Sequence, residues 1–140
     1  MSKRTFRNSL HIRHVDAGSC NGCEAELSAL LNPLYDLQRY GLDFVASPRH
    51  ADAVTVSGPV TRAMREPLQR AVEATPEPRF LIALGDCALG LGPVATGYTV
   101  LGGLHALYPP DLQIPGCPPP PATILKALRG LQNAAVPDGR

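Results

Sequence analysis

The sequence has no tryptophan, few other aromatic residues and almost no net charge. Its 140 residues include three phenylalanines and four tyrosines, and 13 basic side chains are balanced by 12 acidic ones. A chain with so little excess charge presents no positive field to attract nucleic acid and no basic run to bind an anionic membrane. Electrostatics therefore excludes nucleic acid as a partner and indicates no other.

The N-terminus also lacks the features of a targeting segment. The basic residues of MSKRTFRNSL are not followed by an apolar stretch, so we expect neither a signal peptide nor a membrane anchor. We expect the chain to stay in the cytoplasm, where thiols remain reduced and four cysteines are poor candidates for structural disulfides.

The length and composition indicate one globular domain over residues 1–140, with a core from about residue 10 to residue 130 and flexible termini. Apolar residues make up 44% of the chain and charged residues 18%, which argues against disorder. The 15 prolines and 13 glycines indicate that much of the backbone is loop held in fixed shapes.

Strand-like and helix-like segments alternate along the chain. Alternating or continuous apolar residues predict strands at 10–15, 42–47, 52–58 and 79–85. Helical periodicity predicts helices at 24–31, 61–74 and 118–130. Pro67 must kink the second helix or mark its true start, and Gly130 is expected to end the third.

This alternation predicts an α/β domain of three layers, with a flavodoxin-like parallel sheet and helices on both of its faces. In such a sheet, the loops that leave the carboxyl ends of the strands gather along one edge, and ligands bind there. Cys20 and Cys23 follow the first predicted strand, Cys87 follows the fourth, and Cys117 directly precedes the last helix. We therefore expect all four cysteines to converge on one edge.

Four cysteines at one point suit a metal centre. Structural zinc usually takes its ligands as two close pairs, whereas only Cys20 and Cys23 are paired here. Iron-sulfur clusters also take four cysteines, commonly with a proline after the last, as in Cys117-Pro118. A single 4Fe-4S cluster fits best. A dithiol oxidoreductase that uses Cys20 and Cys23, and a zinc-stabilised interaction module, remain alternatives.

Four motifs, GSCNGCEAEL, VSGPVT, LGDCA and PGCPP, resemble those of one family. It comprises the small, cluster-bearing subunit of energy-converting membrane-bound [NiFe] hydrogenases, including formate hydrogenlyase, and the 20 kDa subunit of respiratory complex I. The resemblance covers roughly residues 10 to 130. It implies that Cys20, Cys23, Cys87 and Cys117 bind the cluster and that Glu26 lies near it, in a second-shell or proton-coupled role.

The resemblance implies an electron-transfer subunit of an oxidoreductase complex that itself catalyses nothing. Electrons would pass between a ferredoxin-like subunit and the [NiFe] site of a hydrogenase large subunit, at the inner face of the cytoplasmic membrane and next to membrane subunits. In complex I the first two cysteines are adjacent in sequence, and the two-residue gap between Cys20 and Cys23 favours the hydrogenase branch. A complex I-like relay to a quinone is the alternative.

Other residues have simpler explanations. Glu24 lies in the first turn of a predicted helix, where acidic side chains are favourable whatever their function. The four histidines are scattered singly, and we assign none of them to iron. Residues 87–110 contain no charged side chain, but their five glycines are too many for a membrane-spanning helix. We expect this stretch to be an apolar loop region buried against the large subunit.

Overall fold

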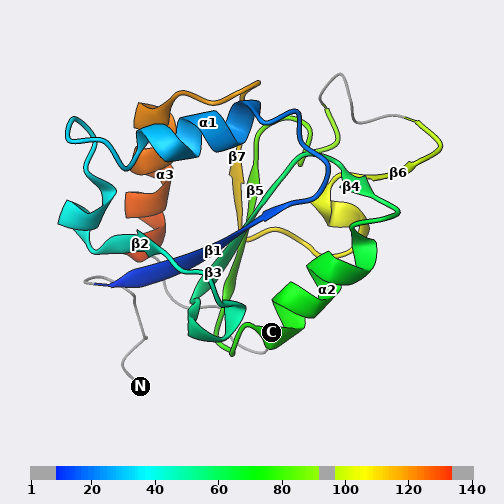
Figure 1. Ribbon diagram of the computed structural model, residues 1–140, viewed down its shortest axis with the longest axis horizontal. Coiled ribbons are helices and arrows are strands. Elements are labelled where there is room, and N and C mark those ends of the chain that lie inside the picture. The colour runs from blue at the N-terminus through cyan, green and yellow to red at the C-terminus, as the bar shows by residue number, and fades with distance from the viewer. Residues whose placement is uncertain (1–8, 92–96, 134–140) are drawn as a thin grey trace.

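A five-stranded parallel sheet forms the centre of the protein. The computed structural model describes residues 9–91 and 97–133, so the expected flexible termini at 1–8 and 134–140 lie outside the described residues (Figure 1). The strand order is β2-β1-β3-β5-β7 with every neighbouring pair parallel, which is the flavodoxin-like order. The strands are β1 (Leu10–Asp16), β2 (Leu42–Phe44), β3 (Ala53–Ser57), β5 (Phe80–Leu84) and β7 (Leu112–Ile114).

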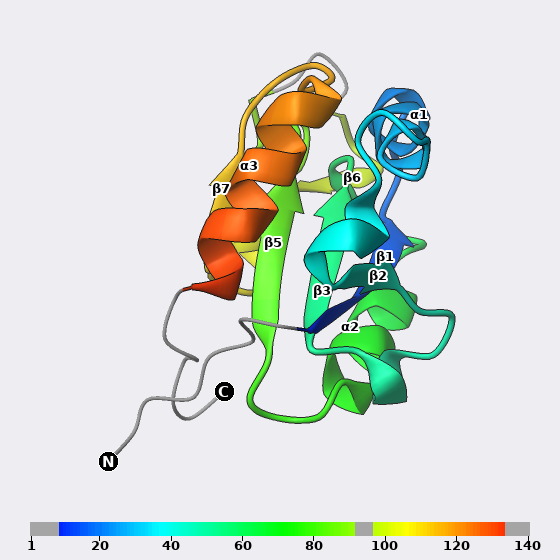
Figure 2. The same cartoon turned by 90° about the vertical axis from the view of Figure 1, so that its left-hand side faces the viewer.

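Helices cover both faces of this sheet, which confirms the predicted three-layer α/β fold. Figures 1 and 2 show two helices on one face and the third on the other. The two that share a face are α1 (Gly22–Ala29) and α3 (Pro121–Gln132), and the third is α2 (Arg65–Ala74).

Each face has its own hydrophobic core. On one side, Leu27 of α1 and Ile124 and Leu128 of α3 pack on the sheet. On the other, Leu68 and Val72 of α2 do the same. Strands β3 and β5 are buried at every residue, and burial on both faces explains why the sequence of β5 is a continuous apolar run.

Two helix boundaries resolve points that the sequence left open or predicted wrongly. Helix α2 begins at Arg65, so Pro67 lies in its first turn, where a missing N–H leaves no hydrogen bond unmade. Helix α3 does not end at Gly130 but continues to Gln132. The extra turn is held by burial of Leu131 and by a hydrogen bond of 2.8 Å from the Gln132 side chain to the Tyr40 carbonyl.

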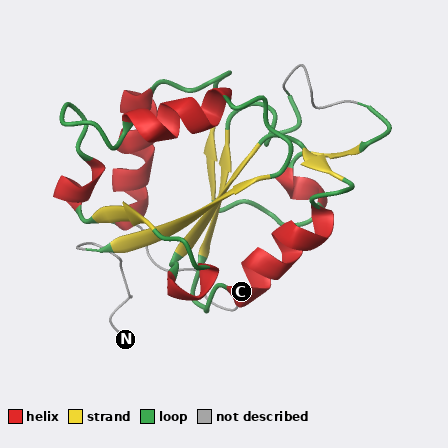
Figure 3. Ribbon diagram, in the orientation of Figure 1, coloured by secondary structure: helices red, strands yellow, loops and turns green. Residues whose placement is uncertain are grey.

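Residues 97–114 contain more regular structure than the sequence indicated (Figure 3). The strands β4 (Val60–Thr61) and β6 (Val100–Gly102) form a small antiparallel sheet, and the short helix η3 (Leu104–Ala106) follows. Leu104 is fully buried in the α2-side core. The expected loop region at 87–110 is therefore partly folded onto its own domain, although residues 92–96 lie outside the described residues.

Three shorter elements complete the description. They are the 3-10 helices η1 (Leu37–Tyr40) and η2 (Pro48–His50), which flank β2, and η3. Within residues 9–91 and 97–133, no helix has the length and apolar character needed to cross a membrane.

We predict that Gly130→Ala stabilises the protein. Gly130 lies inside α3, and a Cβ added there meets no atom within 4 Å. Alanine at such a position restricts the unfolded chain without a clash, so the free energy of unfolding should rise by about 0.5–1 kcal/mol. Urea denaturation monitored by circular dichroism measures the change, and a loss of stability would contradict the described helix.

Candidate metal centre

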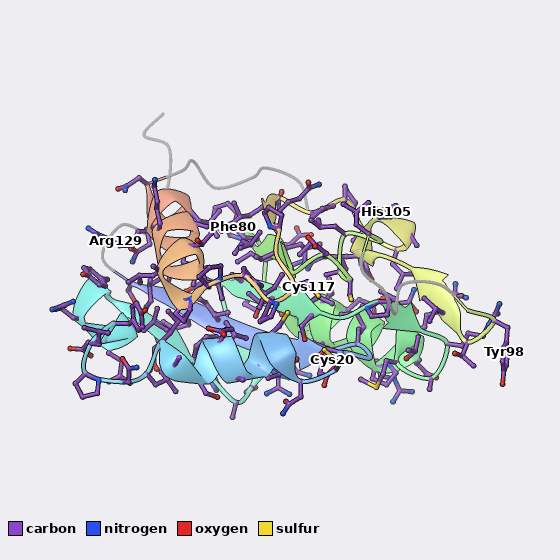
Figure 4. The ribbon with its side chains drawn as sticks, turned by 90° about the horizontal axis from the view of Figure 1, so that it is seen from above. Cys20, Phe80, Tyr98, His105, Cys117 and Arg129 are labelled. Carbon is purple, nitrogen blue, oxygen red and sulfur yellow. The ribbon has the colours of Figure 1, made fainter. Side chains whose placement is uncertain are left out.

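The structure brings the four cysteines to one cavity at the carboxyl edge of the sheet. Cys20 lies in the loop after β1, Cys23 in the first turn of α1, Cys87 in the turn after β5, and Cys117 between β7 and α3. Together they line a cavity of about 80 Å³. Figure 4 shows Cys20 and Cys117 near the middle of the molecule, between α1 and the segment that leads into α3.

The four thiols differ in exposure. Cys20 and Cys117 are exposed, whereas Cys23 and Cys87 are half-buried. Burial raises the pKa of the Cys23 thiol to about 11, and the neighbouring Glu24 and the other three cysteines raise it further. Four thiolates therefore cannot share this cavity without positive charge among them, and a bound metal centre would supply that charge.

Backbone geometry leaves room for the sulfurs. Gly85 ends β5 with φ +85°, and a Cβ on this residue would lie 2.7 Å from the Cys23 sulfur. Gly58, which lines the same cavity, has φ +75°, and its Cβ would lie 2.4 Å from the Ser19 nitrogen. Both positions need glycine, because a side chain would displace the loop that holds Cys20 and Cys23.

Asp86 joins the loop of Cys87 to the loop of Cys117. Its backbone N–H donates to the Gly116 carbonyl at 2.8 Å, and the Gly116 N–H donates to the Asp86 carboxylate at 2.9 Å. The two bonds hold the carboxyl ends of β5 and β7 in register beyond the sheet. The sequence analysis did not identify this residue, although an acidic side chain directly before a candidate ligand was a visible signal.

Asp16 gives the first cysteine loop its shape. Its carboxylate accepts the backbone N–H groups of Gly18 at 2.9 Å and Ser19 at 2.7 Å. The Ala17 N–H donates to the Ser57 carbonyl at 3.0 Å, which ties the end of β1 to the end of β3. The loop is thereby folded back over the sheet edge, so that Cys20 and the start of α1 face the cavity.

Glu24 is more strongly engaged than its position in a helical first turn implied. Its carboxylate accepts hydrogen bonds from the Ser19 hydroxyl at 2.5 Å, from the Ser57 hydroxyl, and from the His14 ring at 3.0 Å. Burial alone would raise the pKa of this carboxyl, but the three hydrogen bonds outweigh it and lower the pKa to about 2. Helix-end electrostatics is therefore not its whole role, and His14 belongs to the surroundings of the site.

Glu26, the glutamate that the resemblance places near the cluster, is partly buried in the same helix. Among the described residues, no hydrogen bond or ion pair is found for its side chain, and it does not line the cavity of the cysteines. Its second-shell or proton-coupled role stays a prediction.

The arrangement of the cysteines bears on what the cavity can hold. In the described part of the chain, no three His, Cys, Asp or Glu side chains are close enough to bind a single metal ion. The four sulfurs instead surround a space that they share with glycine backbone and Pro118. Four sulfur donors around such a space fit an iron-sulfur cluster, which binds one cysteine at each of its irons.

Fold and cavity define a parallel α/β domain that gathers cysteines from three loops at the carboxyl edge of its sheet. Residues 20–131 match the family model described as NADH ubiquinone oxidoreductase, 20 Kd subunit. The chain belongs to this family, whose members are subunits of oxidoreductase complexes of the complex I and hydrogenase type.

Two relatives and one solved structure illustrate the similarity. Formate hydrogenlyase subunit 7 of Escherichia coli K12 is 45% identical over 122 residues, which cover 87% of this chain and 48% of that protein. The probable membrane-bound hydrogenase subunit mbhJ of Pyrococcus furiosus is 44% identical over 82% of this chain and 69% of its own length. A chain of the membrane-bound sulfane sulfur reductase, an archaeal respiratory membrane complex, superposes with a TM-score of 0.77 and 29% identity, covering 90% of this chain and 70% of that one.

These comparisons confirm the family that the motifs indicated. The chain spans about half the length of formate hydrogenlyase subunit 7. The relatives are parts of membrane-bound complexes, as their names state.

We predict that Gly85→Ala disrupts the cysteine cavity. The left-handed backbone and the approach of the new Cβ to the Cys23 sulfur should together lower the free energy of unfolding by about 1–3 kcal/mol. Urea denaturation measures this loss, with Gly130→Ala as the matched control because the same change is made where space is open. Equal stability of the two variants would show that Gly85 is not constrained as described.

Proposed function

We propose that the chain carries one 4Fe-4S cluster on Cys20, Cys23, Cys87 and Cys117. In this role it relays electrons between a ferredoxin-like subunit and the [NiFe] site of a hydrogenase large subunit. One observation carries the proposal, namely that four cysteines from three separate loops line a single cavity. When bound, such a cluster accepts and donates electrons at a potential set by its surroundings.

The chain's own residues would hold and shield the cluster. The half-buried Cys23 and Cys87 would hold its inner side, and the exposed Cys20 and Cys117 its outer side. Gly22 and Cys23 are the first residues of α1 and line the cavity, so the positive end of the helix dipole would face the anionic centre. Nothing in this arrangement calls for a nucleophile or general base, and we infer that the chain by itself is not catalytic.

The exposed outer side of the cavity is where we place the partner subunit. Electron transfer needs a short path, and a partner that covers Cys20 and Cys117 would provide one while excluding water. We infer that the ferredoxin-like subunit and the large subunit both reach this edge of the sheet. Glu26 would then couple proton movement to electron transfer, as the resemblance implies.

Association with the membrane would occur through partner subunits. Relatives of the chain are named as membrane-bound, and the described helices are too short to span a bilayer. We infer a peripheral position in a membrane-associated complex, on the cytoplasmic side.

A quinone-linked, complex I-like relay is the second candidate, and the family model itself favours it. The similarity to a sulfane sulfur reductase chain shows that this fold also occurs in a complex named for a different substrate. We favour the hydrogenase because the two curated relatives described above are hydrogenase-type subunits. The spacing of Cys20 and Cys23 also supports that branch. The protein that copurifies with the chain, and whether it binds nickel, distinguishes these candidates.

The dithiol and zinc alternatives make different demands on the same cysteines. A dithiol oxidoreductase would need only Cys20 and Cys23, so replacing Cys87 or Cys117 would leave it active. A zinc module would be colourless and contain one zinc. The shared cavity of all four cysteines supports the cluster over both.

We predict that the protein purified anaerobically with its partners is brown and contains about four irons and labile sulfide per chain. Cys117→Ser should lose most of the iron and the visible absorbance. The sheet should remain folded, because Cys117 is exposed and lies outside the strands. Iron and sulfide analysis measures the loss, and circular dichroism monitors the fold. Full iron content in Cys117→Ser, or one zinc and no iron in the unmodified chain, would refute the proposal.

A further inference from the structure

Glu24 is a carboxylate fixed beside the cysteine cavity without lining it. It directly follows Cys23, and its electrostatic contribution to the Cys23 thiol exceeds that of any other cysteine. Its side chain is 19% exposed and bonded to residues of three other segments. The carboxylate is therefore held in one place.

The residues that hold Glu24 come from the sheet and from the cysteine loop. Ser19 belongs to the loop of Cys20 and lines the cavity, and Ser57 ends β3 directly before the cavity-lining Gly58. His14 on β1 is itself oriented by Thr55 of β3, whose hydroxyl lies 3.1 Å from Nδ1. The acceptor for the Ser19 hydroxyl and the anchor on the strands are thus the same carboxylate.

The surrounding charges do little to offset this carboxylate. Asp86 is the one other charged side chain at the cavity, it is also acidic, and no lysine or arginine is among the lining residues. Among the described residues, the basic side chain found in contact with Glu24 is His14. Because the pKa of Glu24 is lowered to about 2, its negative charge is present throughout the physiological range.

We propose that Glu24 is a potential-setting residue, whose fixed negative charge beside Cys23 lowers the reduction potential of the centre held by the four cysteines. This inference rests on the proposed function. Reduction adds one electron to a group that is already anionic, and a neighbouring negative charge makes that step less favourable. Ser19, Ser57 and His14 act through Glu24 by keeping its carboxylate in position.

The test is a redox titration of the complex that contains the full chain, monitored by electron paramagnetic resonance of the reduced cluster. Glu24→Gln keeps the size of the side chain and removes its charge. We expect it to favour reduction at least tenfold, which is a rise in midpoint potential of about 59 mV for one electron.

Two further variants separate charge from structure. Glu66→Gln removes the same charge from α2, on the other face of the sheet, where the side chain is 71% exposed, and it should change the equilibrium less than twofold. Ser57→Ala keeps the Glu24 charge and removes one of its hydrogen bonds, and its shift should be less than half that of Glu24→Gln.

The possible outcomes separate this inference from the proposed function. If the unmodified complex has no cluster signal on this chain, the proposed function itself fails. If the signal is present but Glu24→Gln leaves its midpoint potential unchanged, only the role of Glu24 is refuted. A shift in Ser57→Ala as large as that in Glu24→Gln would also refute it, because loop position and not charge would then set the potential.

Discussion

Four thiols around one small cavity resist being together, and the rest of the structure serves to keep them there. As thiolates they repel one another, and partial burial makes each charge harder to form, as the raised pKa of Cys23 shows. The parallel sheet overcomes this by fixing the carboxyl ends of β1, β5 and β7 along one edge. The sulfurs are then confined by backbone geometry before any centre binds.

The sheet alone does not position the loops, and three acidic side chains complete the task. Asp16 shapes the turn before Cys20, Asp86 joins the loops of Cys87 and Cys117, and Glu24 ties the start of α1 to β1 and β3. Each carboxylate accepts bonds that would otherwise be left unmade near the cavity. Together they make the edge rigid and negative, which suits a centre whose potential depends on nearby charge.

The cavity is shielded on one side only. Cys23 and Cys87 lie toward the cores of the domain, while Cys20 and Cys117 remain exposed. A domain of this family works within a larger complex, and the exposed side is where another subunit can complete the shielding. The asymmetry connects the fold of a single chain to its proposed place between an electron donor and an acceptor.

The sequence by itself determined the class of fold and the candidate cysteines. The periodicity of 10–15, 52–58 and 79–85 predicted the strands because burial on one or both faces leaves a direct pattern of apolar residues. The four motifs predicted the family because they lie at strand ends in a fixed order. Short elements escaped detection, since β7 and β6 have three residues each, too few for any period to be seen.

Only the tertiary structure decided which side chains support the site. Glu24 and Glu26 are equivalent in a sequence pattern, two acidic residues near the start of one helix. The hydroxyls of Ser19 and Ser57 and the ring of His14 single out Glu24, and His14 and Ser57 lie 10 and 33 residues away from it along the chain. The continuation of α3 past Gly130 likewise depends on a distant contact, with Tyr40. Contacts between residues remote in sequence leave no local pattern, because the partners meet only when the sheet has formed.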